Sequence, residues 1–214
     1  MGTAGGERVG AILFDLLMAV MDSPAVWSGA VHDERLGLAW RDEVTARMVA
    51  SGAYTPYEAL VASAARELGL PARATSDLLA GWRTMSPRPD SAAIARLAVP
   101  YAFVTNCSRD LAKVAAHRSG LAPRFTLSAE EAGWYKPDVR IYRAACRRLD
   151  LSPGRVALVA GSVHDAEGGA RAGLPSALVL RRPDQGTPEP PIRVVTSLEE
   201  AVDRLLDDTL QPDR

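Results

Sequence analysis

Near the start of the chain stands the sequence Ala11-Ile-Leu-Phe-Asp-Leu-Leu-Met-Ala-Val-Met-Asp22. The apolar run Val9–Phe14 ends at a single carboxylate, Asp15, and a run this short is typical of a buried parallel strand. In an open α/β sheet, ligands bind off the carboxyl ends of the strands, where Asp15 would lie. A carboxylate in that place can act as a nucleophile, a base or a metal ligand. It can also simply cap the turn that follows the strand.

The composition restricts the kinds of protein that this chain can be. It has 214 residues, and 25 basic against 26 acidic residues give a net charge of −1, so we expect no nucleic-acid partner. No apolar run approaches the roughly 20 residues of a membrane span, so we expect no membrane partner. Two cysteines are too few for a disulfide framework, and the expected location is a reducing cytoplasm. Only two basic residues are lysines, Lys113 and Lys136, so a specific role explains a lysine here better than general charge does.

Two kinds of pattern divide the chain. Residues 21–89 are rich in Ala, Leu, Glu and Arg, with apolar residues at helical spacing. From residue 90 onward, short apolar runs alternate with helical patterns, which is typical of a parallel doubly wound sheet. We therefore predict an α/β protein with a Rossmann-like core of residues 1–20 and 90–214. A small helical cap, residues 21–89, would be inserted after the first strand.

Polar residues follow the predicted strands. Asp15 follows the first, Thr105 and Asn106 follow the second, Lys136 precedes a helix in the third segment, and Asp165 follows the fourth. Because the carboxyl ends of parallel strands share one edge, we expect these side chains to converge. Asp15 would attack an electrophilic carbon or phosphorus, and Lys136 would keep it ionised, since a nearby cation favours the charged carboxylate. Thr105 and Asn106 would donate hydrogen bonds, and Asp165 would orient Lys136 or position the water that splits the intermediate.

The order of these residues resembles that of the haloacid dehalogenase-like hydrolase superfamily. The motifs are Asp15, Thr105-Asn106, Lys136-Pro137 and Gly161-Ser162-Val163-His164-Asp165. Each motif alone is weak, but four in this order, together with the helical insertion, make the resemblance specific over nearly the whole chain. It implies a Rossmann-like fold with a cap, and a hydrolase that uses an aspartate nucleophile.

Within the superfamily, the resemblance favours the L-2-haloacid dehalogenase branch over the phosphatases. Phosphatases carry a second Asp, a general acid, where this chain has Leu17, and an acidic residue where it has Gly161. A Mg²⁺-dependent phosphatase is the alternative, and it would have only Asp15 and Asp165 to hold the ion. The dehalogenase branch lacks the second Asp and needs no metal or other cofactor.

Further residues match the dehalogenase branch. Trp40-Arg41 resembles a Trp-Arg pair whose Arg contacts the substrate carboxylate and the halide, and Tyr142 resembles the Tyr that follows the Lys-Pro motif. The resemblance implies that Asp15 displaces halide from C2 of a small anionic organic substrate. Water would then hydrolyse the ester to a 2-hydroxy acid of inverted configuration. Homodimers are common in this family, and the apolar positions of the insertion leave a homodimer open for this chain.

Five positions depart from the family's pattern. Leu17 replaces a Tyr that lines the halide pocket, and Ala19 replaces a Thr that hydrogen-bonds the nucleophile. Ala160 and Ser162 replace a Ser and an Asn, and His164 replaces an aromatic residue. Loss of one well-placed donor lowers a rate by about 10²–10³. One hypothesis is a hydrolase with a rebuilt pocket, whose predicted substrate contacts are Arg41, Asn106, Leu17, Ser162, His164 and Tyr142. The other is a catalytically inactive binding protein on the same fold.

Overall fold

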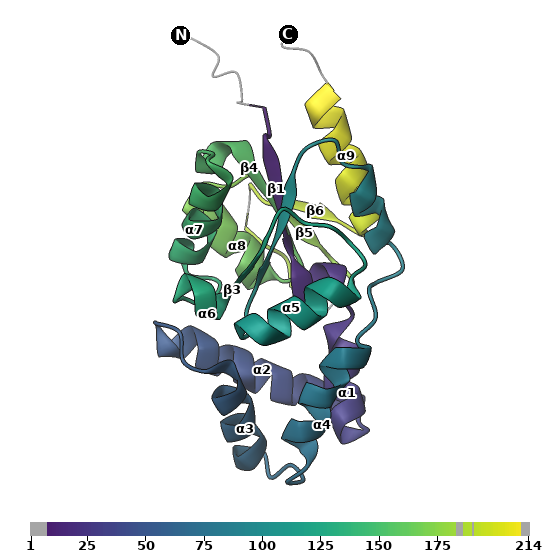
Figure 1. The fold of residues 1–214 in the computed structure, drawn as a ribbon, viewed down its shortest axis with the longest axis vertical. Coiled ribbons are helices and arrows are strands. Elements are labelled where there is room, and N and C mark those ends of the chain that lie inside the picture. Colours follow the sequence, from purple (N-terminus) through teal and green to yellow (C-terminus); the bar gives the residue numbers. More distant parts are fainter. Residues whose placement is uncertain (1–7, 183–185, 190, 211–214) are drawn as a thin grey trace.

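Six strands form one parallel sheet within the residues that the structure describes, in the order β3-β2-β1-β4-β5-β6 (Figure 1). The strands are β1 (Ala11–Asp15), β2 (Tyr101–Thr105), β3 (Thr126–Ser128), β4 (Val156–Ala160), β5 (Ser176–Val179) and β6 (Arg193–Val195). The computed structural model describes residues 8–182, 186–189 and 191–210, with the backbone alone at 206–210. The remaining parts of the predicted core lie outside the described residues. The doubly wound α/β fold is confirmed.

Strand β1 occupies the centre of this sheet, between β2 and β4. All five of its residues are buried, as expected for a parallel strand that is covered on both faces. The strand order reverses between β1 and β4, and such a reversal opens a crevice beyond the carboxyl ends of the two strands. Asp15 is the last residue of β1, so the fold places it at this crevice.

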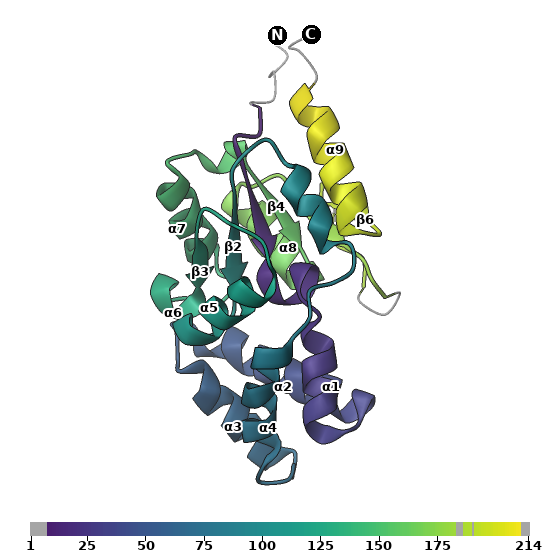
Figure 2. The ribbon, with the colours of Figure 1, turned by 45° about the vertical axis from the view of Figure 1, so that its right-hand side comes forward.

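Helices cover both faces of the sheet. They are α5 (Arg109–Arg118), α6 (Ala129–Ala132), α7 (Val139–Leu149), α8 (Val163–Ala172) and α9 (Leu198–Leu210). Helices α7 and α8 pack together on one face, whereas α5 and α9 lie on the other (Figures 1 and 2). Among the described residues, none of the helices combines the length and the apolar character that a membrane span requires.

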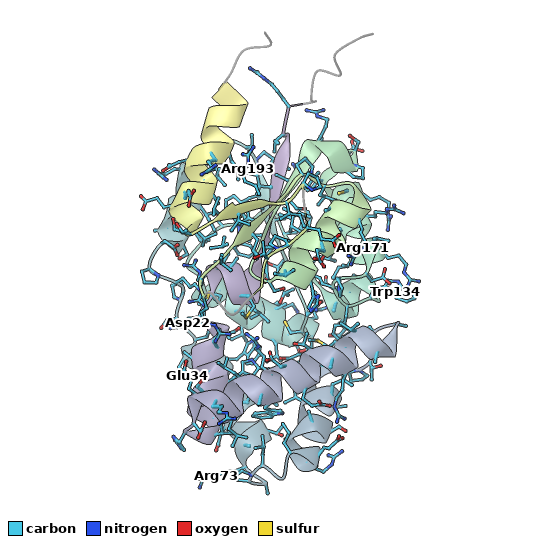
Figure 3. All side chains as sticks on the ribbon, turned by 180° about the vertical axis from the view of Figure 1, so that it is seen from behind. Asp22, Glu34, Arg73, Trp134, Arg171 and Arg193 are labelled. Atoms are coloured by element: carbon cyan, nitrogen blue, oxygen red, sulfur yellow. The ribbon has the colours of Figure 1, made fainter. Side chains whose placement is uncertain are left out.

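Four more helices form a layer beyond the carboxyl edge of the sheet, which we term the helical layer (Figure 3). They are α1 (Ser23–Val31), α2 (Glu34–Ser51), α3 (Tyr57–Glu67) and α4 (Ala74–Gly81). The Asp33 side chain caps the start of α2 by accepting a hydrogen bond from the Leu36 N–H at 2.8 Å. All four helices fall within residues 21–89, although the division of the chain into two domains stays a prediction.

Two elements, helix α1 and strand β6, could not be predicted from hydrophobic periodicity. Helix α1 begins with Ser23 and Pro24 and contains Gly29, so it lacks a long amphipathic stripe. Tertiary packing secures it: the rings of Trp27 and Trp40 meet edge to face, with centroids 5.0 Å apart. Strand β6 is only three residues long, and two of them are exposed, which leaves little apolar pattern to detect.

A π-helical turn, Leu16–Val20, joins β1 to the helical layer, and no sequence pattern predicts it. Two guanidinium groups stabilise the turn: Arg88 donates to the Met18 carbonyl at 3.3 Å and Arg181 to the Ala19 carbonyl at 3.2 Å. Gly161, after β4, lies against the same turn. A Cβ atom at Gly161 would stand 2.5 Å from Met18 Cβ and 2.6 Å from the Ala19 nitrogen. Glycine therefore lets the two loops that flank the crevice touch.

We predict that Gly161→Ala destabilises the protein by about 1–3 kcal/mol, because the added methyl group meets backbone atoms that cannot move aside. Gly29→Ala is the matched control, since nothing lies within 4 Å of its added Cβ in helix α1. That change should leave stability the same or raise it by up to about 1 kcal/mol. Urea unfolding of both variants provides the measurement, and equal stability of the two would contradict the packing argument.

Candidate functional site

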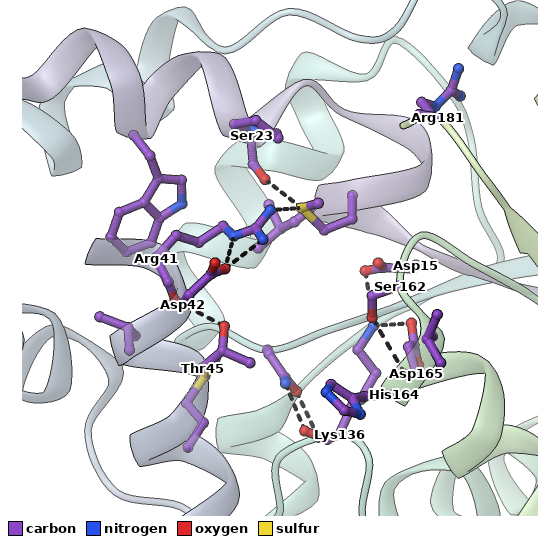
Figure 4. Close-up of a pocket in the computed structure, with 18 of the residues that line it drawn as sticks. Asp15, Ser23, Arg41, Asp42, Thr45, Lys136, Ser162, His164, Asp165 and Arg181 are labelled. Carbon is purple, nitrogen blue, oxygen red and sulfur yellow. Dashed lines mark hydrogen bonds and ion pairs between the residues drawn. The ribbon is translucent and has the colours of Figure 1, made fainter. Parts of the chain in front are cut away.

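A cleft of about 1320 Å³ lies between the carboxyl edge of the sheet and helices α1 and α2 (Figure 4). Most of the predicted site residues line it, namely Asp15, Leu17, Arg41, Asn106, Lys136, Ser162, His164 and Asp165. They come from the ends of β1, β2 and β4, from the loop before α7, and from α2. The predicted convergence of the strand ends at one edge is thus seen in the fold.

Lys136 joins two carboxylates at the floor of the cleft. Its Nζ donates to Asp15 Oδ1 at 2.8 Å and to Asp165 Oδ2 at 2.7 Å. All three side chains are buried, so water screens the charges poorly. The cluster carries two negative charges and one positive charge, and the ammonium group is what allows both carboxylates to lie side by side.

The protonation equilibria of the cluster reflect burial and its charges. Burial lowers the pKa of Lys136, but the attraction of Asp15 and Asp165 outweighs that effect and holds this pKa above its ordinary value. Burial raises the pKa of the Asp165 carboxyl above its ordinary value, although Lys136 acts in the opposite direction. Lys136 is therefore charged across the range in which proteins are folded.

Asp165 has both carboxylate oxygens engaged. Tyr142 donates its hydroxyl proton to Asp165 Oδ1 at 2.6 Å, opposite the Lys136 bond to Oδ2. Ser162 caps helix α8, because its hydroxyl oxygen accepts a hydrogen bond from the Asp165 N–H at 3.4 Å. With both oxygens occupied, Asp165 is set to orient Lys136.

Asn106 fixes the backbone of the lysine. Its Nδ2 donates to the Lys136 carbonyl at 2.9 Å, and its Oδ1 accepts from the Lys136 N–H at 2.7 Å. The peptide bond that follows, between Lys136 and Pro137, is cis. These two bonds span 30 residues of sequence, so they tie the end of β2 to the loop that carries Lys136.

Two predicted site residues do not line the cleft. Thr105 is fully buried, and its hydroxyl lies 3.5 Å from the sulfur of Cys107. Tyr142 is fully buried behind Asp165. Cys107 itself is no thiolate, because burial raises the pKa of its thiol to about 12.

Arg41 lies at the opposite wall of the cleft, on α2. Its guanidinium donates twice to the neighbouring Asp42 carboxylate, from Nε at 3.1 Å and from Nη2 at 2.6 Å. Its Nη1 approaches the Met18 sulfur at 3.4 Å. The cleft thus holds a cation whose bidentate face is filled by a carboxylate of the protein itself (Figure 4).

Asp42, Met18, Arg88 and Arg181 also line the cleft, and the sequence reasoning missed them. Asp42 is adjacent to a predicted residue, and Arg181 comes shortly after β5, at the same edge as the other strand ends. Its position just after a predicted strand could have identified Arg181 as a residue of the cleft. Asp22 pairs with Arg88, and Asp90 with Arg181, so both arginines serve the π-turn while they border the cleft.

The donor set does not fit the Mg²⁺ alternative. Asp15 and Asp165 share one ammonium group, and the position where a further acidic residue would stand is Gly161, which has no room for a side chain. Within the described part of the chain, no three His, Cys, Asp or Glu residues gather closely enough to hold an ion.

Comparison with known proteins identifies relatives of this chain. Residues 77–173 match the family model of haloacid dehalogenase-like hydrolases. (S)-2-haloacid dehalogenase 1 of a Pseudomonas species is 25% identical over 94% of this chain and 98% of its own length. (S)-2-haloacid dehalogenase 4A of Burkholderia cepacia is 39% identical, but over 29% of this chain and 26% of its own length.

A solved structure shows the same architecture. L-2-haloacid dehalogenase from Xanthobacter autotrophicus with chloropropionic acid covalently bound superposes with a TM-score of 0.78. It is 19% identical, and the alignment covers 94% of this chain and 99% of that one. Over residues 77–173, the chain is thus similar to the haloacid dehalogenase-like hydrolases. Within that class, its curated and structural neighbours are L-2-haloacid dehalogenases.

We predict that Lys136→Met destabilises the protein by about 3–5 kcal/mol near pH 8, because it leaves two buried carboxylates without their cation. A carboxyl whose pKa is raised by folding favours the folded state at low pH, and that contribution is lost as the pH rises. Removal of Lys136 raises the pKa of Asp165 further, so the variant should regain stability as the pH falls from about 8 to about 5.

Thermal unfolding against pH measures this effect. The matched control is Lys113→Met, at the chain's other lysine, whose side chain is exposed and pairs with Asp110 at 3.5 Å. The control should follow the wild-type pH profile. A Lys136→Met profile parallel to that of the wild type would show that the two carboxylates are not coupled.

Proposed function

We propose that this protein is a metal-independent hydrolase that attacks an electrophilic carbon through Asp15, as its resemblance to L-2-haloacid dehalogenases implies. The observation that best supports this proposal is that Lys136 Nζ contacts one oxygen of Asp15, Oδ1. Among the described residues, nothing donates a hydrogen bond to Oδ2, and Asp15 lines the cleft. The carboxylate is thus held in one orientation and keeps one oxygen for attack.

The reaction proceeds in two steps. Asp15 Oδ2 forms a bond to C2 of a 2-halo acid, and the carbon–halogen bond breaks, so the halide leaves with the electron pair from the face opposite to the attack. Water then adds to the carbonyl carbon of the Asp15 ester. The ester bond breaks, one proton is released, and a 2-hydroxy acid of inverted configuration departs from the regenerated carboxylate. Lys136 stabilises the negative charge on Asp15 before attack and again at the hydrolysis step.

Arg41 is proposed to bind the substrate carboxylate. Arginine suits this task because its planar guanidinium binds a carboxylate in two parallel hydrogen bonds. Asp42 already uses that geometry, so the substrate must displace it or bind the remaining N–H groups. Ser162, His164 and Leu17 line the cleft near Asp15 and form the proposed wall around C2 and the halide. The helical layer would then act as the predicted cap.

The replaced residues bear on the rate. Ala19 brings no hydroxyl to the nucleophile, and its carbonyl instead accepts from Arg181. Ala160 is fully buried and also brings no donor. The orientation of Asp15 therefore rests on Lys136, and we expect turnover that is slower than the family pattern would support.

We predict that the protein releases halide from 2-chloro and 2-bromo acids in the presence of EDTA. Asp15→Asn should abolish release, because an amide is not a nucleophile at C2. Asp77→Asn is the control, since this aspartate lies on α4 and pairs with Arg73 away from the cleft. Halide electrode or ion chromatography measures release. No Asp15-dependent release from any of these acids would contradict the proposed function and favour ligand binding without turnover.

We further predict that Asp42→Asn lowers KM for 2-halo acids about twofold to fivefold and leaves kcat unchanged. The amide binds Arg41 less strongly than the carboxylate does, so the substrate displaces it more easily. A largely exposed ion pair such as Arg41–Asp42 contributes about 0.2–1 kcal/mol, which limits the change in KM to a few fold. Steady-state kinetics provides the measurement. A higher KM in the variant would show that Asp42 supports the substrate and does not compete with it.

A further inference from the structure

The cleft is larger than a three-carbon acid requires. Its volume of about 1320 Å³ exceeds the roughly 300–1,000 Å³ of pockets that hold drug-sized ligands. Chloropropionic acid, the molecule bound in the Xanthobacter structure, has three carbons. The residues that line the cleft indicate what kind of group could fill the additional volume.

Helix α2 forms one long wall, and its residues change in character along the helix. Glu34 lines the cleft at the start of the helix, and Arg41 and Asp42 line it about two turns later. Thr45 and Ala46 follow one turn after them, and Val49 lies one turn beyond. Eight residues at 1.5 Å each place Val49 about 12 Å from Arg41 along the helix axis. The wall thus runs from a charged end, past small side chains, to an apolar end.

Val49 is exposed at this apolar end. Its 53% exposure is the largest among the exposed large hydrophobic residues in the described part of the chain. Met48, beside it on α2, and Tyr57, at the start of α3, also line the cleft. When an apolar ligand covers an exposed apolar side chain, water is removed from both surfaces, which favours binding.

Two apolar residues outside the helical layer also line the cleft. Leu17 lines the cleft where the resembled family carries a Tyr, so a phenol ring and its hydroxyl are absent. Pro137, after Lys136, contributes a further apolar surface. Leu17 follows Asp15 by two residues and Pro137 follows Lys136 directly, so both apolar side chains line the cleft next to the charged cluster in sequence.

We propose that the substrates are 2-halo acids that carry a medium-length apolar chain, with the carboxylate at Arg41, C2 at Asp15, and the chain directed along α2 to Val49. This inference rests on the proposed function. Val49 is then a specificity-determining residue. Longer chains bind more tightly because they bury more apolar surface against it.

The test measures kcat/KM for halide release from 2-bromo acids of three to ten carbons in EDTA. Each methylene buried in the cleft should raise kcat/KM about fourfold until the chain passes Val49. Val49→Asp should flatten or reverse this dependence, because a charge then faces the chain. Leu36→Asp is the matched control: Leu36 is an exposed apolar residue on the same helix, at 36% exposure, outside the cleft. It should keep the wild-type dependence.

The outcomes separate this inference from the proposed function. If Asp15-dependent release is fastest with 2-bromopropionate, or if Val49→Asp leaves the dependence on chain length unchanged, the inference is overturned and the proposed function stands. Calorimetric titration with octanoate and propionate tests chain binding without turnover. Octanoate should bind at least about tenfold more tightly to the wild type, and less tightly to Val49→Asp. Equal affinity for the two acids overturns the inference whether or not halide is released.

Discussion

One ammonium group between two buried carboxylates is the interaction on which the rest of this structure depends. Asp15 ends strand β1, Asp165 follows the neighbouring strand β4, and Lys136 comes from the loop before α7, so their meeting requires these three distant segments to be assembled. Without the lysine, like charges would repel in a medium that screens them poorly. With it, Asp15 is held at one oxygen and keeps the other for chemistry. The same contact therefore serves the fold and the proposed reaction.

The surroundings of this cluster keep it in place by hydrogen bonds to both backbone and side chains. Asn106 forms two hydrogen bonds with the backbone of Lys136. Tyr142 donates to Asp165 Oδ1, the carboxylate oxygen that Lys136 does not contact. The π-turn after Asp15 is stabilised from outside by arginine side chains, and Gly161 allows it to approach the loop after β4. The residues that the chain lacks relative to the family pattern are donors to the nucleophile, whereas the residues that position the charge cluster are present.

The sequence predicted the sheet, the shared edge and most of the cleft residues, because strand periodicity and strand ends are local signals. It could not predict side-chain direction. Asp15 pairs in register with Val104, so Thr105, one residue later, points to the other face of the sheet and its hydroxyl meets Cys107. The π-turn and helix α1 also left no pattern, since both depend on distant partners such as Arg181 and Trp40. Asp42 was missed because only the folded chain shows that Arg41 needs a partner.

The most direct test of the account is a single turnover in water enriched in ¹⁸O, with protein in excess over a 2-bromo acid. Attack by Asp15 transfers one of its own oxygens to the product, and hydrolysis of the ester then adds an oxygen from water to the Asp15 carboxylate. The account predicts ¹⁸O in the peptide that contains Asp15 and unlabelled oxygen at C2 of the first hydroxy acid formed, as measured by mass spectrometry. Label at C2 of that acid, with none in Asp15, would show that water attacks the carbon directly and would contradict the aspartate nucleophile.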